Sequence, residues 1–73
     1  MNITRHGEFV DFVRDGVLGK EVIRVFPRTE KIAAWIEDED VARTGMGSRE
    51  VMFLTLTEIL TFIEAGKREM YGP

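Results

Sequence analysis

A helix capping box near the C-terminal end of the chain is the sequence feature that most constrains the fold. Thr55 and Glu58 have the spacing of an N-cap residue and an N3 glutamate, which bond reciprocally to backbone N–H groups at the start of a helix. Apolar residues follow at the i, i+3, i+4 and i+7 positions, with Phe62 at the edge of their stripe: Leu56, Ile59, Leu60 and Ile63. The pattern predicts an amphipathic helix that packs on a sheet through this stripe.

The neighbouring residues set the expected ends of this helix. Arg49–Leu54 is predicted to be a strand that leads into it. Gly66 lies beside Lys67 and Arg68, cations that stabilise the negative end of a helix macrodipole, so we place the C-terminal end near this point. The strand and helix together are expected to span Arg49–Glu69, and a continuation of the helix to Met70 stays open.

Two runs rich in β-formers predict an antiparallel hairpin upstream. Lys20–Phe26 stops at Pro27, which lacks an N–H group and therefore suits the end of a strand. Lys31–Glu37 alternates well enough to return beside it after a short connection. Alternation puts one set of side chains on the face that the C-terminal helix would cover: Ile23, Val25, Ile32, Ala34 and Ile36. The opposite face would carry Val22, Arg24, Phe26 and Trp35.

The N-terminal part of the chain allows two interpretations. In Gly7–Asp15, three apolar residues fall at helical spacing: Phe9, Val10 and Val13. The alternative, a strand over Glu8–Val13, is interrupted because Phe12 and Val13 follow one another and break the alternation. We therefore expect a short helix, which would cover the opposite face of the sheet and bury Trp35. Without that cover, Trp35 would belong to an exposed contact surface.

These elements predict one α+β domain over residues 1–73, with a small three-stranded antiparallel sheet, a short N-terminal helix and a C-terminal amphipathic helix. The chain has no cysteine, which suits a reducing cytoplasm. No apolar run approaches the roughly 18 residues of a membrane span, and the first residues lack the apolar core of a signal peptide. We expect a cytoplasmic protein with no membrane partner.

The sequence offers no constellation for catalysis. His6 is the single histidine and lies in a segment expected to be loose, so no triad can be built around it. Thr44–Ser48 lacks the lysine and the spacing of a P-loop. The acidic run Glu37–Asp40 lacks the spacing of a calcium loop. We therefore expect a protein that is not an enzyme and that uses no cofactor and no metal.

Charge argues against direct binding of nucleic acid. The formal net charge is -3, which opposes attraction to phosphate groups. A small nucleic-acid-binding module remains the alternative, because five basic residues fall in the expected first helix and hairpin, with acidic residues interleaved among them: Arg14, Lys20, Arg24, Arg28 and Lys31.

The residue types favour a partner-binding surface instead. Trp, Phe and Arg are frequent at binding hot spots, and an acidic run at the start of a long loop, Asp38–Ser48, suits a basic surface on another protein. The candidate partner-binding residues are Arg24, Phe26, Arg28, Trp35, Glu37, Asp38, Glu39, Asp40 and Arg43. The expected partner is a larger protein complex, whose surface the chain would cover or compete for.

In its length, its acidity and its Trp35 and Glu37–Asp40 surface, the chain resembles the small α+β proteins with which bacteriophages disable host machinery. One such class binds host RNA polymerase, blocks initiation and suppresses termination. The resemblance implies a phage-encoded transcription regulator that binds bacterial RNA polymerase in the host cytoplasm. The same features suit a phage inhibitor of a host defence nuclease. Because no family motif matches position by position, no functional residue is transferred.

Overall fold

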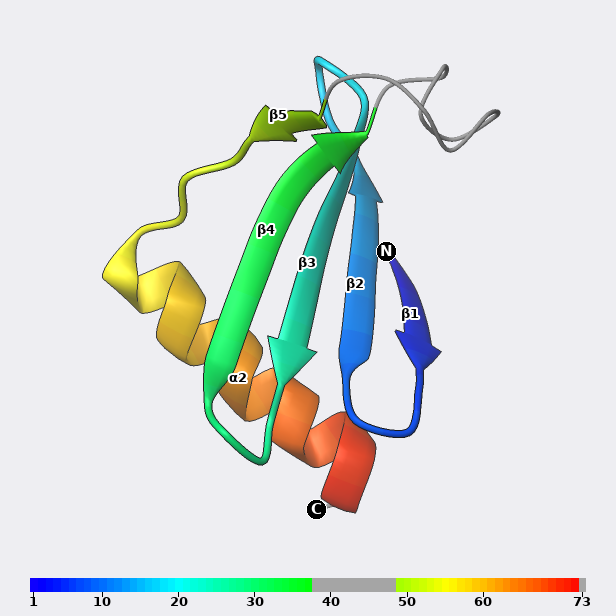
Figure 1. Ribbon diagram of the computed structural model, residues 1–73, viewed down its shortest axis with the longest axis vertical. Helices are drawn as coiled ribbons and strands as arrows, with labels where there is room; N and C mark the ends of the chain where they lie inside the picture. The colour runs from blue at the N-terminus through cyan, green and yellow to red at the C-terminus, as the bar shows by residue number, and fades with distance from the viewer. Residues whose placement is uncertain (38–48, 73) are drawn as a thin grey trace.

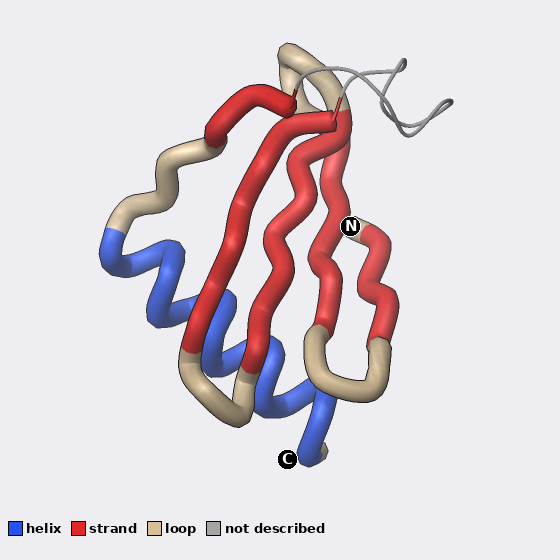
Figure 2. The backbone as a smooth tube through the Cα atoms, in the orientation of Figure 1, coloured by secondary structure: helices blue, strands red, loops and turns tan. Residues whose placement is uncertain are grey.

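The computed structural model describes residues 1–37 and 49–72, which form an antiparallel sheet with one helix packed on one face (Figure 1). The strands lie in the sheet in the order in which they occur in the chain, so the described strands form a meander (Figure 2). The strands are β1 (Asn2–Arg5), β2 (Val10–Asp15), β3 (Lys20–Phe26), β4 (Lys31–Glu37) and β5 (Arg49–Val51). The helix is α2 (Leu56–Tyr71).

The α+β class and the central hairpin are confirmed. β3 and β4 have the predicted bounds, and they pair antiparallel in a register that places Val22 opposite Trp35. The capping box is also present, since Glu58 N–H donates to Thr55 Oγ1 and Thr55 N–H donates to Glu58 Oε1. The predicted strand before the helix is shorter than expected and ends at Val51.

The predicted N-terminal helix is wrong, and so is the three-stranded sheet. Residues 10–15 form β2, between β1 and β3, and the described residues form a five-stranded sheet. The two adjacent apolar residues that argued against a strand point to opposite faces. Phe12 is buried on the helix side beside Ile23, while Val13 lies on the other face beside Val22. Both faces of β2 carry apolar side chains, so strict apolar–polar alternation is not required of this strand.

The hydrophobic core lies between α2 and the three middle strands. Its buried members are Val10, Phe12, Ile23, Val25, Phe62 and Ile63. The Phe12 and Phe62 rings meet with their centroids 5.4 Å apart, in a tilted arrangement that aromatic pairs prefer. This contact joins β2 to α2 directly.

Gly66 lies where α2 comes close to β3, and the predicted helix end near this residue is wrong. It is buried inside α2, and a Cβ atom added to it would lie 2.6 Å from Val25 Cγ1. The helix continues to Tyr71, one residue beyond the open alternative that ended at Met70. It ends at Gly72, whose φ of 81° favours glycine and whose N–H donates to the Arg68 carbonyl oxygen.

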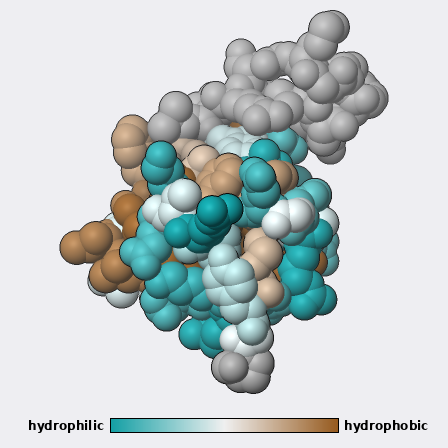
Figure 3. All heavy atoms as spheres, turned by 60° about the horizontal axis from the view of Figure 1, so that its bottom comes forward, coloured by the Kyte–Doolittle hydropathy of each residue, from teal (hydrophilic) through white to brown (hydrophobic). Residues whose placement is uncertain are grey.

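The buried stripe of α2 is rotated from the predicted one. Phe62, Ile63 and Gly66 are the buried residues of the helix, and Ile59 and Met70 pack against the core. Leu56 and Leu60, predicted to face the core, are 71% and 55% exposed. The rotation follows from Gly66, because a helix turns its narrowest side to a sheet that it approaches closely. Exposed apolar surface gathers on the side of the molecule where α2 begins (Figure 3).

Candidate functional site

The face of the sheet opposite α2 carries the candidate site, and we call it the open face. Side chains alternate along each strand, so residues two apart share a face. Arg24 and Trp35 therefore lie opposite the core residues of β3 and β4, as the sequence predicted, and Asp11 joins them from β2. Within residues 1–37 and 49–72, α2 is the only helix, and it packs on the other face. Trp35 is half-buried rather than covered by a helix.

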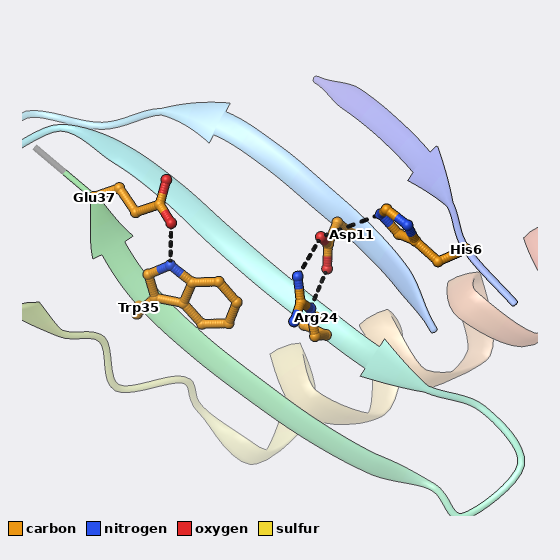
Figure 4. Close-up of polar contacts among 5 residues, drawn as sticks. All are labelled: His6, Asp11, Arg24, Trp35 and Glu37. Atoms are coloured by element: carbon orange, nitrogen blue, oxygen red, sulfur yellow. Dashed lines mark hydrogen bonds and ion pairs between the residues drawn. The ribbon is translucent and has the colours of Figure 1, made fainter. Parts of the chain in front are cut away.

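Arg24 is held in a fixed position by Asp11, its direct cross-strand partner. Arg24 Nε donates to Asp11 Oδ1 at 2.9 Å, and Nη2 donates to Oδ2 at 3.0 Å, so the pair is bidentate (Figure 4). Asp11 is only 8% exposed, and its carboxylate is satisfied by this guanidinium. The hydrogen bond to Asp11 raises the pKa of Arg24, while partial burial opposes that shift. Arg24 is therefore a permanent, oriented cation on the open face.

Two aromatic rings flank the same guanidinium. Arg24 Cζ lies 4.0 Å from the Phe9 ring centroid and 5.2 Å from the Trp35 ring centroid, both within the range of cation–π attraction. Phe9 also stacks on the His6 ring at 4.3 Å and meets Phe26 at 5.6 Å. We call Phe9, Arg24 and Trp35 the aromatic–arginine cluster. Its parts come from three segments of the chain, and the strand register brings them together.

Polar contacts extend the cluster at both ends. Trp35 Nε1 donates to Glu37 Oε1 at 2.9 Å, which fixes the indole along β4 (Figure 4). At the other end, His6 Nε2 lies 3.7 Å from Asp11 Oδ2. A row of polar and aromatic groups therefore crosses the sheet from the β1–β2 loop to the end of β4.

A pocket adjoins the cluster at the Phe26 side. It has a volume of about 450 Å³ and lies between the β1–β2 loop, the β3–β4 turn and the end of α2. Arg28 and Tyr71 line it together with Phe26. Of the predicted residues, Phe26 and Arg28 line this pocket, and Phe26 meets the Phe9 ring that lies against Arg24.

The structure places some of the predicted site residues and leaves others undescribed. Trp35 and Glu37 lie on the same face of β4, which allows the hydrogen bond between them. The remaining predicted residues, Asp38, Glu39, Asp40 and Arg43, and the predicted loop Asp38–Ser48, lie outside the described residues. Sequence reasoning missed Phe9 and Asp11, and it gave His6 no role. The available signal was the Asp11–Arg24 pairing, which becomes visible only when residues 10–15 are a strand.

The basic residues that kept a nucleic-acid module open are largely neutralised. Arg14 Nε lies 2.6 Å from Glu21 Oε1, and Lys20 Nζ lies 2.5 Å from Asp15 Oδ1. Lys20 also holds the pKa of Asp15 below its usual value, chiefly by their hydrogen bond. With Arg24 bonded to Asp11, three of the five basic residues of this group face a carboxylate. Such pairing lowers the positive potential that phosphate binding needs.

Comparisons of the chain with models of known protein families, with curated proteins and with solved structures gave no match. In the described ranges, no three His, Asp or Glu side chains are grouped so that they could hold a metal ion. The described helix is too short and too polar to cross a membrane. The open face, with its aromatic–arginine cluster, is therefore the candidate functional surface.

Proposed function

We propose that this chain is a non-enzymatic regulator that binds another protein through the open face of its sheet. The aromatic–arginine cluster carries this proposal. Trp and Arg are the residue types most enriched at interface hot spots, and here they lie in contact on a face that α2 does not cover. The adjacent pocket offers room for a partner side chain between Phe26 and Arg28.

The cluster is ordered before any partner arrives. Arg24 is fixed by two hydrogen bonds and lies against two rings, and Trp35 is fixed by its bond to Glu37. Immobilising a flexible side chain on binding costs about 0.5 to 1.5 kcal/mol, and a side chain that is already fixed avoids much of that cost. A rigid aromatic platform with its charge internally balanced suits a protein surface better than a polyanion.

The acidic run that begins at Glu37 indicates the chemistry of the partner. Four acidic residues in succession, Glu37–Asp40, continue from the end of β4. They suit a partner whose surface carries Lys and Arg beside an apolar contact, and such charges raise the association rate more than the affinity. Proteins that normally hold nucleic acid have surfaces of this kind.

Bacterial RNA polymerase is the partner that we propose to test first. This choice rests on the resemblance to small phage proteins in length, acidity and the Trp35 and Glu37–Asp40 surface. The mechanism would be steric, with the chain covering a site that promoter DNA or a transcription factor uses. An inhibitor of a host defence nuclease would use the same surface and differs only in the partner.

Binding of the purified polymerase to immobilised chain at near-physiological salt tests this function, with run-off transcription as the second readout. We expect Trp35→Ala to weaken binding by about 30-fold or more, the size of a hot-spot loss of about 2 kcal/mol. Leu60→Ala is the matched control, because it truncates an exposed apolar side chain of α2, on the other face. Circular dichroism spectra of both variants check that each one is folded.

The possible outcomes separate the surface from the partner. If the polymerase does not bind, it is the wrong partner. A different protein retained from a bacterial lysate by wild type and by Leu60→Ala, but not by Trp35→Ala, would keep the surface and replace the partner. If Trp35→Ala and Leu60→Ala behave alike against every bound protein, the open face is not the binding surface.

A further inference from the structure

The two edges of the sheet differ in how well they are protected against pairing with another strand. β5 is three residues long and carries Arg49 and Glu50. β1 has one charged residue, Arg5, whose Nη1 lies 3.7 Å from Glu69 Oε2. β1 contains no proline or glycine, and all four of its residues are exposed. Natural edge strands usually carry charges, prolines or bulges that prevent pairing, and β1 lacks these features along Asn2–Thr4.

The hydrogen-bond pattern shows which backbone groups of β1 point away from the sheet. The His6 N–H donates to the Phe9 carbonyl oxygen at 2.8 Å, so these two residues form a hydrogen-bonded pair of the antiparallel ladder. Hydrogen-bonded and non-hydrogen-bonded pairs alternate along such a ladder. Asn2 and Thr4 therefore bond to β2, whereas Ile3 and Arg5 direct their N–H and C=O groups outward. In the described part of the chain, β1 pairs only with β2.

We propose that the open edge of β1 pairs antiparallel with β1 of a second copy of this chain, about a two-fold axis at Ile3. In this register the two Ile3 residues exchange two N–H···O=C bonds, and Asn2 lies opposite Thr4 of the second copy. The Ile3 side chain, 44% exposed on the helix side of the sheet, meets its own equivalent. The resulting sheet would be continuous across the two copies.

Other positions of the two-fold axis along β1 give less favourable strand pairs. An axis at Arg5 also uses outward backbone groups, but it sets two guanidinium groups opposite one another, which destabilises a strand pair. An axis at Thr4 also uses the outward groups of Ile3 and Arg5, but it sets the apolar Ile3 opposite Arg5 of the second copy. An axis at Asn2 likewise moves the two Ile3 side chains apart. The neutral segment around Ile3 is thus self-complementary, which is why a second copy is the occupant that we choose.

The dimer does not depend on the proposed function and uses a different surface. A two-fold axis perpendicular to the sheet keeps both helices on one face and both open faces on the other. The two aromatic–arginine clusters would therefore face the same side, which would make the assembly bivalent. A pair of four-residue strands should bury less than the ~800 Å² per partner of a standard complex, so we expect a weak association with a Kd on the order of 0.1 to 1 mM.

Sedimentation velocity of the full chain at concentrations from about 0.02 to about 1 mM tests the association. Wild type should shift from monomer to dimer over this range. Ile3→Pro removes the outward N–H group, and proline is tolerated on an edge strand at such a position, so this variant should associate at least 10-fold more weakly. Ile3→Val keeps the N–H group and should associate like wild type. A wild-type chain that stays monomeric at the highest concentration would overturn the proposal, as would unchanged association of Ile3→Pro.

Cysteine cross-linking tests the register and does not depend on whether Ile3→Pro folds. The chain has no cysteine, so single variants report one position each. Residues facing each other in a hydrogen-bonded pair have Cα atoms about 5.5 Å apart, within the range of a disulfide. Ile3→Cys should therefore oxidise to a covalent dimer much faster than Thr4→Cys, because Thr4 lies opposite Asn2 of the second copy and not opposite Thr4. Equal rates, or a faster rate for Thr4→Cys, would contradict an axis at Ile3.

Discussion

Replacing Gly66 by alanine measures how closely α2 lies against β3. A Cβ atom at this position would lie 2.6 Å from Val25 Cγ1 and 3.0 Å from Val25 Cβ. Real Cβ atoms essentially never approach another atom closer than 3.0 Å, so either the helix or the valine must move. Val25 is fully buried and belongs to β3, which is held between β2 and β4. The substitution therefore overpacks the core.

Two effects of opposite sign set the magnitude. Alanine is favoured over glycine in the interior of a helix by about 1 kcal/mol. Overpacking a well-packed core costs about 1 to 3 kcal/mol. The net expectation is a loss of about 0 to 2 kcal/mol in the free energy of unfolding. For a domain of this size, a loss of about 1 kcal/mol lowers Tm by about 4 to 8 °C.

Urea unfolding and thermal melts of Gly66→Ala provide the assay. Gly7→Ala is the control, because a Cβ atom there meets no atom within 4 Å, and we expect it to change stability by less than about 1 kcal/mol. Combining Gly66→Ala with Val25→Ala removes the clashing methyl group. The stability loss of the double variant should therefore be about 0.5 to 3 kcal/mol smaller than the sum of the losses of the two single variants. A Gly66→Ala protein that is more stable by the full helix-propensity gain would refute the close approach.

Two further predictions concern α2. Ile63→Ala should cost about 2 to 5 kcal/mol in urea unfolding, whereas Leu60→Ala should cost less than about 1 kcal/mol, and equal losses would contradict the observed rotation of the helix. Hydrogen bonds with Thr55, chiefly the one from its backbone N–H group, hold the pKa of Glu58 below its usual 4.5. The resulting stabilisation is present above the unfolded-state pKa and is lost as pH falls through the folded-state pKa, so Glu58→Gln should flatten the fall of the urea midpoint between about pH 5 and pH 2. An unchanged pH profile would show that the capping carboxylate contributes nothing.

The elements that depend on local sequence signals could be predicted. β3 and β4 are predictable because β-branched residues, a terminal proline and a short connection all lie within the hairpin. The start of α2 is predictable because a capping box is a short-range motif. β2 was not predicted because its identity depends on neighbours on both sides. Its succession of Phe12 and Val13 makes sense only when Val13 meets Val22 across the open face.

The rotation of α2 shows a second limit of sequence reasoning. Apolar residues cover more than half of its circumference, so the sequence permits two stripes, one through Leu56 and Leu60 and one through Phe62 and Gly66. Hydrophobicity alone favours the first, because glycine adds no apolar surface. Close packing against Val25 selects the second, since the missing Cβ of Gly66 lets the helix approach the sheet. This choice depends on shape, which composition does not encode.

The replacement of the predicted N-terminal helix by β2 also changes the functional argument. A helix at residues 7–15 would have covered Trp35 and left Arg24 without a defined partner. As a strand, the same segment brings Asp11 opposite Arg24 and places Phe9 at the end of the neighbouring loop, where its ring lies against the guanidinium. The residues that were expected to cover the open face instead build its cluster. The candidate site and the failed secondary-structure prediction therefore have one physical cause, which is the pairing of β2 with β3.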